Sequence, residues 1–366
     1  MLSPEILISL YRRIRSRRLK AWAVAVMRAA GVRYLVIRMD TTNLCNLRCR
    51  MCYYSAEQKR KSQQMDVALF DKIAGEVFPL TRFLYLSCAT EPLMNRNFAD
   101  FLDSVGRHHV PFTSFCTNGI LLSERVVESA IRANLSEIIF SVDGATPETY
   151  EYIRRGARWK TLVEKLDLFR ALKEKAGTER PVGRINFTCM SRNIHELPPL
   201  VRFASEHGIR NIHVRHLLAF TDGASEMSCR DQMEYRKCFN RVAQEAQAEA
   251  RRLALELFLP DPIPDPTPPT APAPPSRKRE ANPYCLIPWF QAIIGPTGDY
   301  RLCSRFRPFG NLRDQSFATI YWSSAMQQLR RDLLRRRPGA CSWTCGEEAY
   351  AASDAKKDSQ EATVDA

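Results

Sequence analysis

Six short runs of β-branched and aromatic residues, each followed by a stretch of helical periodicity, constrain the fold of this 366-residue chain more than any other feature. The runs lie between about residues 34 and 220 and read YLVIRM, RFLYLS, PFTSFC, EIIFSV, RINFTC and IHVRHL. Strands that alternate with helices pair in parallel, because each helix returns the chain to the same end of the sheet. The pattern predicts an α/β fold built on a partial (β/α)6, TIM-like barrel.

Composition divides the rest of the chain into smaller segments. We predict a basic amphipathic helix over 1–33, the barrel over 34–225, a helical connector over 226–259, a proline-rich linker over 260–282, a small cysteine-bearing domain over 283–347 and a disordered tail over 348–366. The first helix sets Ile6, Leu7, Leu10 and Ile14 against a row of arginines. It either lies on a membrane surface or packs across one end of the barrel.

The chain carries 54 Lys and Arg against 40 Asp and Glu, a formal net charge of +14. This balance favours an anionic partner, but charge alone does not choose among phosphate, nucleic acid, lipid headgroups and acidic peptides. No apolar run reaches the ~18 residues of a membrane span. The 12 cysteines lie in apolar strands or group at metal-like spacing, which indicates a reducing compartment. We expect a cytoplasmic protein, at the membrane surface if the first helix binds lipid.

Cys45, Cys49 and Cys52 place three soft thiolates within a few residues of one another. Thiolates select iron-sulfur clusters or zinc over hard cations, and a structural zinc ion is closed by four ligands. Neither a histidine nor a fourth cysteine stands beside the three. Three ligands suit a four-iron cluster with one iron left open. Half a zinc site and a redox-active cysteine pair are the alternatives.

The spacing C-x3-C-x2-C after the first strand resembles the signature of the radical S-adenosylmethionine (radical SAM) superfamily. The resemblance implies that these three cysteines bind a 4Fe-4S cluster whose open iron is chelated by the amino and carboxylate groups of S-adenosylmethionine. It also implies a low-potential electron donor such as flavodoxin or ferredoxin. The electron cleaves the sulfonium and yields a 5'-deoxyadenosyl radical, which takes a hydrogen atom from the substrate.

Further family motifs stand at the ends of the later strands. SCATEPLMN has Ala89, Thr90 and Glu91 where the family has a Gly-Gly-Glu turn, and the resemblance implies that Glu91 holds the ammonium group of the cofactor. Ala89 and Thr90 lack the freedom of glycine at positive φ. CTNG, which ends at Gly119, resembles the Thr-Asn-Gly turn, and SVDG resembles the Ser-x-Asp-Gly stretch of the peptide-modifying branch. The cofactor contacts that the resemblance implies are Met51, Tyr53, Thr90, Glu91, Asn118, Ser141, Asp143 and Asn186.

Other residues at the strand ends leave two interpretations open, and no catalytic residue is predicted. Cys88, Cys116 and Cys189 are candidate hydrogen donors or acids, but such cysteines are more often small buried hydrophobes. His213 and His216 either reach the barrel interior or satisfy their hydrogen bonds elsewhere in the core or at the surface.

The C-terminal segment holds a second set of cysteines: Cys285, Cys303, Cys341 and Cys345. Four thiolates complete one site, and a closed zinc site is one possibility. The context, with PTGDYRLC as a hairpin, then GNL and Trp322, resembles the SPASM and twitch extensions of radical SAM enzymes. The resemblance implies a shortened domain with one auxiliary 4Fe-4S cluster. Full thiolate ligation favours electron transfer over direct substrate binding.

Together these features predict a radical SAM enzyme. The leading substrate is a peptide or protein that undergoes dehydrogenation, cross-linking or epimerisation, and the alternative is a small molecule or lipid precursor. A zinc-stabilised nucleic-acid-binding protein is the non-enzymatic alternative. It needs a basic face interleaved with exposed aromatics, whereas the arginines here are spread along helices, so no nucleic-acid partner is expected.

Overall fold

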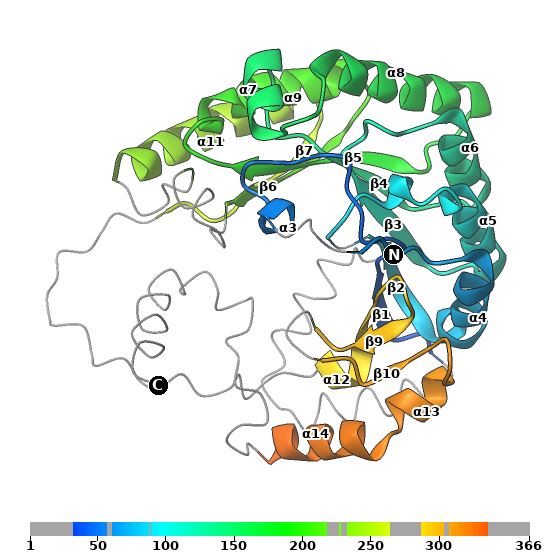
Figure 1. Ribbon diagram of the computed structural model, residues 1–366. Helices are drawn as coiled ribbons and strands as arrows, with labels where there is room; N and C mark the ends of the chain where they lie inside the picture. Colours follow the sequence, from blue (N-terminus) through cyan, green and yellow to red (C-terminus); the bar gives the residue numbers. More distant parts are fainter. Residues whose placement is uncertain are drawn as a thin grey trace, which may run out of the picture.

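The computed structural model describes residues 32–56, 61–87, 89–217, 227, 233–263, 287–303 and 307–335. These residues form one open sheet of ten strands in the order β10-β9-β8-β1-β2-β3-β4-β5-β6-β7. The sheet curves into an arc with helices on its outer side (Figure 1). The two edge strands of the described sheet, β10 and β7, do not pair with each other, so the barrel is partial.

The six predicted strands are all present, and each pairs in parallel with its neighbours. They are β1 (Leu35–Met39), β2 (Thr81–Leu86), β3 (Phe112–Thr117), β4 (Glu137–Ser141), β5 (Val182–Cys189) and β6 (Asn211–His216). A seventh, β7 (Glu256–Phe258), pairs in parallel with β6. The stretch expected to be helical throughout therefore ends in a strand, which at three residues is too short to show a sequence period.

Helices follow the strands and cover the convex face of the sheet (Figure 1). The longer ones are α4 (Val67–Val77), α5 (Phe98–His108), α6 (Glu124–Arg132), α8 (Trp159–Ala176), α9 (Leu197–Glu206) and α11 (Met233–Arg252). Shorter elements follow the strand ends: α3 (Tyr53–Ala56), α7 (Pro147–Ile153) and the 3-10 helices η1 (Phe78–Leu80), η2 (Pro92–Met94) and η3 (Ile194–Glu196).

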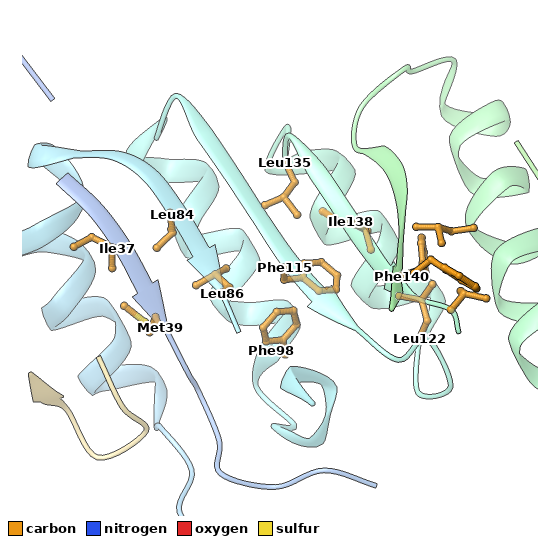
Figure 2. Close-up of a cluster of buried hydrophobic side chains, with 14 of the residues drawn as sticks. Ile37, Met39, Leu84, Leu86, Phe98, Phe115, Leu122, Leu135, Ile138 and Phe140 are labelled. Carbon is orange, nitrogen blue, oxygen red and sulfur yellow. The ribbon is translucent and has the colours of Figure 1, made fainter. Parts of the chain in front are cut away.

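The main core lies between the sheet and these helices. Figure 2 shows side chains from neighbouring strands, among them Ile37, Leu84 and Ile138, gathered on the same side of the sheet. Phe115 of β3 meets Phe98 of α5 edge to face, with 5.0 Å between ring centroids. Since successive side chains of a strand alternate between faces, the neighbours of Phe115 point toward the concave side of the arc.

The C-terminal segment continues the same sheet beside β1. Its elements are α12 (Ile287–Phe290), β8 (Gln291–Ile294), β9 (Asp299–Arg301), β10 (Gly310–Asn311), α13 (Phe317–Tyr321) and α14 (Ser324–Leu334). β8 pairs in parallel with β1, and β8 and β9 form the predicted hairpin. Lys72 of α4 donates to the Leu312 carbonyl at 2.8 Å, and Glu76 accepts from the Phe317 amide at 2.6 Å. The segment is thus joined to the barrel by both strand pairing and side chains.

Several predicted segments lie outside the described residues: the N-terminal helix apart from Val32 and Arg33, the linker beyond Ile263, and the tail. Among the helices of the described part, none is long and apolar enough to cross a membrane.

Candidate functional site

The triad cysteines lie on the loop between β1 and α3, at the carboxyl end of the parallel strands, where barrels of this kind place their chemistry. All three are partly buried free thiols. Backbone hydrogen bonds fix this loop against the C-terminal end of α7 and the residues that follow it. The Arg48 amide donates to the Arg155 carbonyl at 2.8 Å, and the Arg50 amide donates to the Ile153 carbonyl at 2.9 Å. We call residues 40–52 the cysteine loop.

The surroundings of the triad determine how it can bind metal. Burial raises the pKa of Cys49 to about 11 and shifts the pKa of Cys45 in the same direction. These thiols are therefore neutral near pH 7 without metal, and they release protons when they become ligands. No three His, Cys, Asp or Glu side chains of the described residues form a group that could hold one metal ion. A cubane cluster does not require such convergence, since each cysteine binds a different iron, so the triad suits a cluster better than a single zinc ion.

Glu91 lies beside the cysteine loop, and its side chain is buried, with the residue 2 % exposed. Its amide donates to the Leu44 carbonyl at 3.0 Å. The carboxylate accepts hydrogen bonds from Thr117 Oγ1 at 2.7 Å, the Asn118 amide at 2.7 Å and the Leu93 amide at 3.2 Å. Burial raises the pKa of Glu91 to about 7, although these hydrogen bonds act in the opposite direction. No Lys or Arg of the described residues forms an ion pair with it, so the site can accept a cationic ligand group.

Two turns position Glu91 and connect it to the cysteine loop. Asn118 donates through Nδ2 to Asn46 Oδ1 at 2.8 Å, and Gly119 after it takes a positive φ of 83°. Thr90 donates through Oγ1 to the Thr42 carbonyl at 2.7 Å. In the turn that lacks the family's glycines, positive φ occurs at Ser87 (129°) rather than at residues 89 or 90. Ala89 and Thr90 therefore need no glycine-like conformation here.

A row of polar side chains crosses the concave face next to the turns. Cys116 Sγ lies 3.2 Å from Ser141 Oγ, and burial raises the pKa of this thiol. Ser141 is paired in register with Asn186, and Asn186 with His213. The Asn186 Oδ1 atom is buried without a hydrogen-bond partner in the described structure. An unpaired buried acceptor fits a hydroxyl or amino group of a bound cofactor.

A buried ion pair behind this row is the main feature that the sequence did not reveal. Arg154 Nη2 lies 2.6 Å from Asp143 Oδ2, and both side chains are buried. Asp143 Oδ1 also accepts from the Thr188 amide at 2.7 Å, and Asn193 Nδ2 donates to the Asp143 carbonyl at 3.0 Å. Burial lowers the pKa of Arg154, but the neighbouring Asp143 carboxylate more than offsets this, so the pKa lies above its usual range. The Asp143 carboxylate is thus already held by protein groups.

The remaining predicted contacts have varied surroundings. Met51 packs against a buried group of Ile153, Met190, Leu217 and Met227. Tyr53 is 45 % exposed at the start of α3.

The other cysteine and histidine residues near the strand ends lie on different faces of the sheet. Cys189 is buried in the main core, and its pKa is raised by burial to about 12. His216 lies on the helix side of β6, where Nδ1 is 3.1 Å from Tyr235 Oη. The His213 ring lies against the Phe258 ring at a tilt of 51°, with 4.4 Å between centroids.

The auxiliary site is described only in part. Cys303 follows β9 and is partly buried. Cys285, Cys341 and Cys345 lie outside the described residues, as does Cys88, so the four-cysteine set stays a prediction.

Comparison with known families identifies two regions of the chain. Residues 39–186 match the family model of the radical SAM superfamily. Residues 285–346 match that of SPASM, an iron-sulfur cluster-binding domain. The first match contains the triad, Glu91, Ser141 and Asn186, and the second spans all four C-terminal cysteines.

Individual relatives are distant. The tungsten-containing aldehyde ferredoxin oxidoreductase cofactor-modifying protein of Pyrococcus furiosus is 26 % identical over 186 residues, which is 50 % of this chain and 51 % of that protein. The mycofactocin maturase MftC of Mycobacterium tuberculosis is 25 % identical over 174 residues, 48 % of this chain and 42 % of that protein. The chain thus spans about half the length of the curated relatives it matches.

Among solved structures, SuiB of Streptococcus suis bound to the precursor peptide SuiA matches with a TM-score of 0.61 at 13 % identity. The match covers 85 % of this chain and 70 % of SuiB. At this identity the likeness shows that the two proteins share a fold.

Proposed function

This chain belongs to the radical SAM superfamily and carries a SPASM domain, and from that premise we propose that it is an enzyme that modifies a peptide or protein by radical chemistry. The cofactors of the first domain are a 4Fe-4S cluster and S-adenosylmethionine, and the second is an iron-sulfur cluster-binding domain. When bound, the cluster and S-adenosylmethionine supply a 5'-deoxyadenosyl radical that takes a hydrogen atom from carbon.

The residues proposed to hold the cluster and S-adenosylmethionine come from several loops at the carboxyl edge of the sheet. Cys45, Cys49 and Cys52 hold the cluster and leave one iron without a protein ligand. Glu91 receives the ammonium group of S-adenosylmethionine, and it ionises when that cation arrives. Ser141 and Asn186 offer polar atoms to the rest of the cofactor.

The observation that carries the proposal is the link between Glu91 and the cysteine loop. The Glu91 carboxylate accepts from the Asn118 amide, and the Asn118 side chain donates to Asn46, which neighbours Cys45. A buried carboxylate without an ion-pair partner is costly unless a ligand supplies the positive charge. Its position beside three free thiols supports one composite site for a cluster and a cationic nucleotide.

The C-terminal cysteines extend the proposal to the reaction type. We assign Cys285, Cys303, Cys341 and Cys345 to one auxiliary 4Fe-4S cluster. Four thiolate ligands leave no iron open, which suits the removal of a second electron from the substrate. Dehydrogenation, cross-linking and epimerisation of a peptide are the candidate outcomes.

Two relatives point to different substrates. The maturase from Mycobacterium tuberculosis and the peptide-bound SuiB structure favour a peptide. The cofactor-modifying protein from Pyrococcus furiosus favours the alternative, a small molecule. We place the peptide first because the fold match to SuiB covers 85 % of this chain, whereas the match to the Pyrococcus protein covers 50 % of it.

The test uses the full chain, reconstituted anaerobically and reduced with dithionite. We expect 5'-deoxyadenosine to form from S-adenosylmethionine, and the Cys45→Ala/Cys49→Ala/Cys52→Ala variant to form none. Deuterated peptide and small-molecule fractions of cell extract are then offered separately. Deuterium in 5'-deoxyadenosine from the peptide fraction supports the leading substrate, and deuterium only from the small-molecule fraction refutes it. Unchanged cleavage in the triple variant would disprove the assignment of the triad.

A further inference from the structure

Five exposed arginines belong to the cysteine loop and to two loops near it. They come from the loop itself, from the loop after α7 and from the loop after β5, and we call them the arginine rim: Arg48, Arg50, Arg155, Arg158 and Arg192. Two of the three loops are held together by the backbone hydrogen bonds between residues 48–50 and 153–155. The rim arginines of these two loops therefore lie close to the triad.

Contacts with Tyr152 hold two members of the rim in place. The guanidinium carbons of Arg50 and Arg192 lie 4.2 and 3.8 Å from the centroid of the Tyr152 ring. Arg50 Nε also donates to the Tyr152 carbonyl at 3.0 Å. Two like charges on one ring repel each other, and cation–π contact offsets part of this cost. Tyr152 itself is 38 % exposed, so this arrangement faces solvent.

The rim also reaches the backbone of the triad. Arg48 Nη1 donates to the Cys45 carbonyl at 3.3 Å. Arg48 and Arg50 are the sequence neighbours of Cys49 on either side. A molecule that docks on these side chains therefore lies close to the proposed cluster.

Most of the charge of the rim is not neutralised by the protein. Within the described ranges its only ion pair joins Arg158 to Glu151 at 3.1 Å. Arg48, Arg50, Arg155 and Arg192 have no carboxylate partner in that part of the chain. Other exposed arginines, such as Arg125 and Arg132, pair with aspartates of the neighbouring helix. Unneutralised cations concentrated at one mouth of a protein attract and orient an anionic partner.

We infer that the arginine rim docks a small acidic one-electron carrier protein, an inference that rests on the proposed function. The proposed chemistry requires one electron from outside the chain for each cleavage of S-adenosylmethionine. The carrier gives up one electron and is thereby oxidised. The 4Fe-4S cluster held by the triad accepts that electron and is reduced. Charge complementarity places the acidic face of the carrier on the rim, with its redox centre near the cysteine loop.

The test compares two reductants on the full reconstituted protein. An acidic flavodoxin, kept reduced by its reductase, is one, and dithionite, which needs no docking surface, is the other. In the Arg155→Glu/Arg192→Glu variant we expect the KM for flavodoxin to rise about 10-fold or more. The rate of 5'-deoxyadenosine formation with dithionite stays at the native value. Calorimetric titration with oxidised flavodoxin gives a matching rise in Kd and a weaker salt dependence of binding.

The matched control reverses two exposed cations at the opposite end of the barrel, Lys175→Glu/Arg251→Glu. Both lie near the ends of helices that lead into strands, at residues 175 of α8 and 251 of α11. We expect this variant, with the same change in net charge, to keep KM and Kd within about twofold, since exposed charges beyond a Debye length of the docking face are screened.

The outcomes distinguish a failure of the docking inference from a failure of the proposed enzyme class. Equal KM and Kd values in the two reversed variants would overturn the inference, as would a rim variant that loses affinity for an acidic substrate peptide but not for flavodoxin. If charge reversal impairs dithionite-driven cleavage, the milder Arg155→Gln/Arg192→Gln variant is judged by its Kd alone. A native protein that cleaves nothing with dithionite refutes the proposed function, while the calorimetric comparison still decides where the carrier docks.

Discussion

At the scale of single residues, Glu91 is the group whose chemistry the fold changes most. The turn after β2 buries its carboxylate next to the cysteine loop, and three hydrogen-bond donors hold both oxygens. Because burial outweighs those donors, the pKa rises to about 7. The carboxylate is therefore ready to ionise for a cationic ligand, but it destabilises the protein when it ionises without one.

This residue predicts a pH dependence of stability in the metal-free protein. Between about pH 4.5 and 7 the folded state holds a proton on Glu91 that the unfolded state has lost, so stability falls as the pH rises through this window. We expect the native protein to lose about 3 kcal/mol more than Glu91→Gln over that range. Urea denaturation at several pH values measures the difference. Parallel profiles for the two proteins would contradict the assignment.

The buried pair of Arg154 and Asp143 makes a second prediction at this scale. Replacing Arg154 with Gln leaves the Asp143 carboxylate buried with no cation, which costs about 3–5 kcal/mol. Arg155→Gln is the matched control, because its side chain is exposed and it should change stability by no more than about 0.5 kcal/mol. Chemical denaturation of both variants checks the pair. An equally small effect at both positions would show that the ion pair is not needed.

At the scale of elements, the site depends on how α7 is seated after β4. Thr146 caps this helix by accepting from the Thr149 amide at 3.4 Å. Glu196 secures the start of the helix by accepting from Thr146 Oγ1 at 2.8 Å and from the Ala145 amide at 2.6 Å. Gly144 allows the approach, because a Cβ there would lie 2.7 Å from the Tyr150 amide nitrogen. The C-terminal end of α7 thereby places Arg154 beside Asp143. It also places the backbone of residues 153–155 against the cysteine loop.

We accordingly predict that Gly144→Ala displaces α7 and destabilises the protein by about 1–3 kcal/mol. The control is Gly75→Ala within α4, where an added Cβ would meet nothing within 4 Å. That change should stabilise the helix by about 0.5–1 kcal/mol. Melting temperatures of the two variants should move in opposite directions. A Gly144→Ala variant with unchanged stability would show that α7 can shift without destabilising the protein.

The elements also show what local sequence can and cannot predict. The six barrel strands were predictable because their β-branched runs alternate with long helical periods. β7 was not, since its three residues owe their strand to pairing with β6. Nor could a pattern distinguish Arg154 from Arg155: the first is buried against Asp143 and the second is exposed, and only the packing of α7 separates them. Ser87 adopts a positive φ because the turn requires it, although serine rarely adopts this conformation.

At the scale of the whole molecule, one sheet joins the regions matched by two family models. β8 lies beside β1, the strand that leads into the cysteine loop, so the C-terminal segment is anchored at the base of that loop. The sequence predicted both regions from their cysteines and the hairpin from PTGDYRLC. It did not predict their junction, because pairing between strands more than 250 residues apart depends on tertiary structure rather than local pattern. The sequence predicted the triad, Glu91 and the C-terminal cysteines as a set, and their roles stay predictions. The Asn46–Asn118 link could be seen only in the folded chain.

The central claim is that the triad leaves one iron open for S-adenosylmethionine, and electron paramagnetic resonance tests it most directly. The protein is reconstituted with Cys303, Cys341 and Cys345 replaced by alanine, so that only the proposed triad cluster remains, and is reduced with dithionite. Spectra are recorded before and after S-adenosylmethionine is added. We predict a reduced 4Fe-4S signal that changes on addition and is absent when Cys45, Cys49 and Cys52 are also replaced. A signal that stays the same while S-adenosylmethionine binds would contradict the claim, since every iron would then be closed to the cofactor.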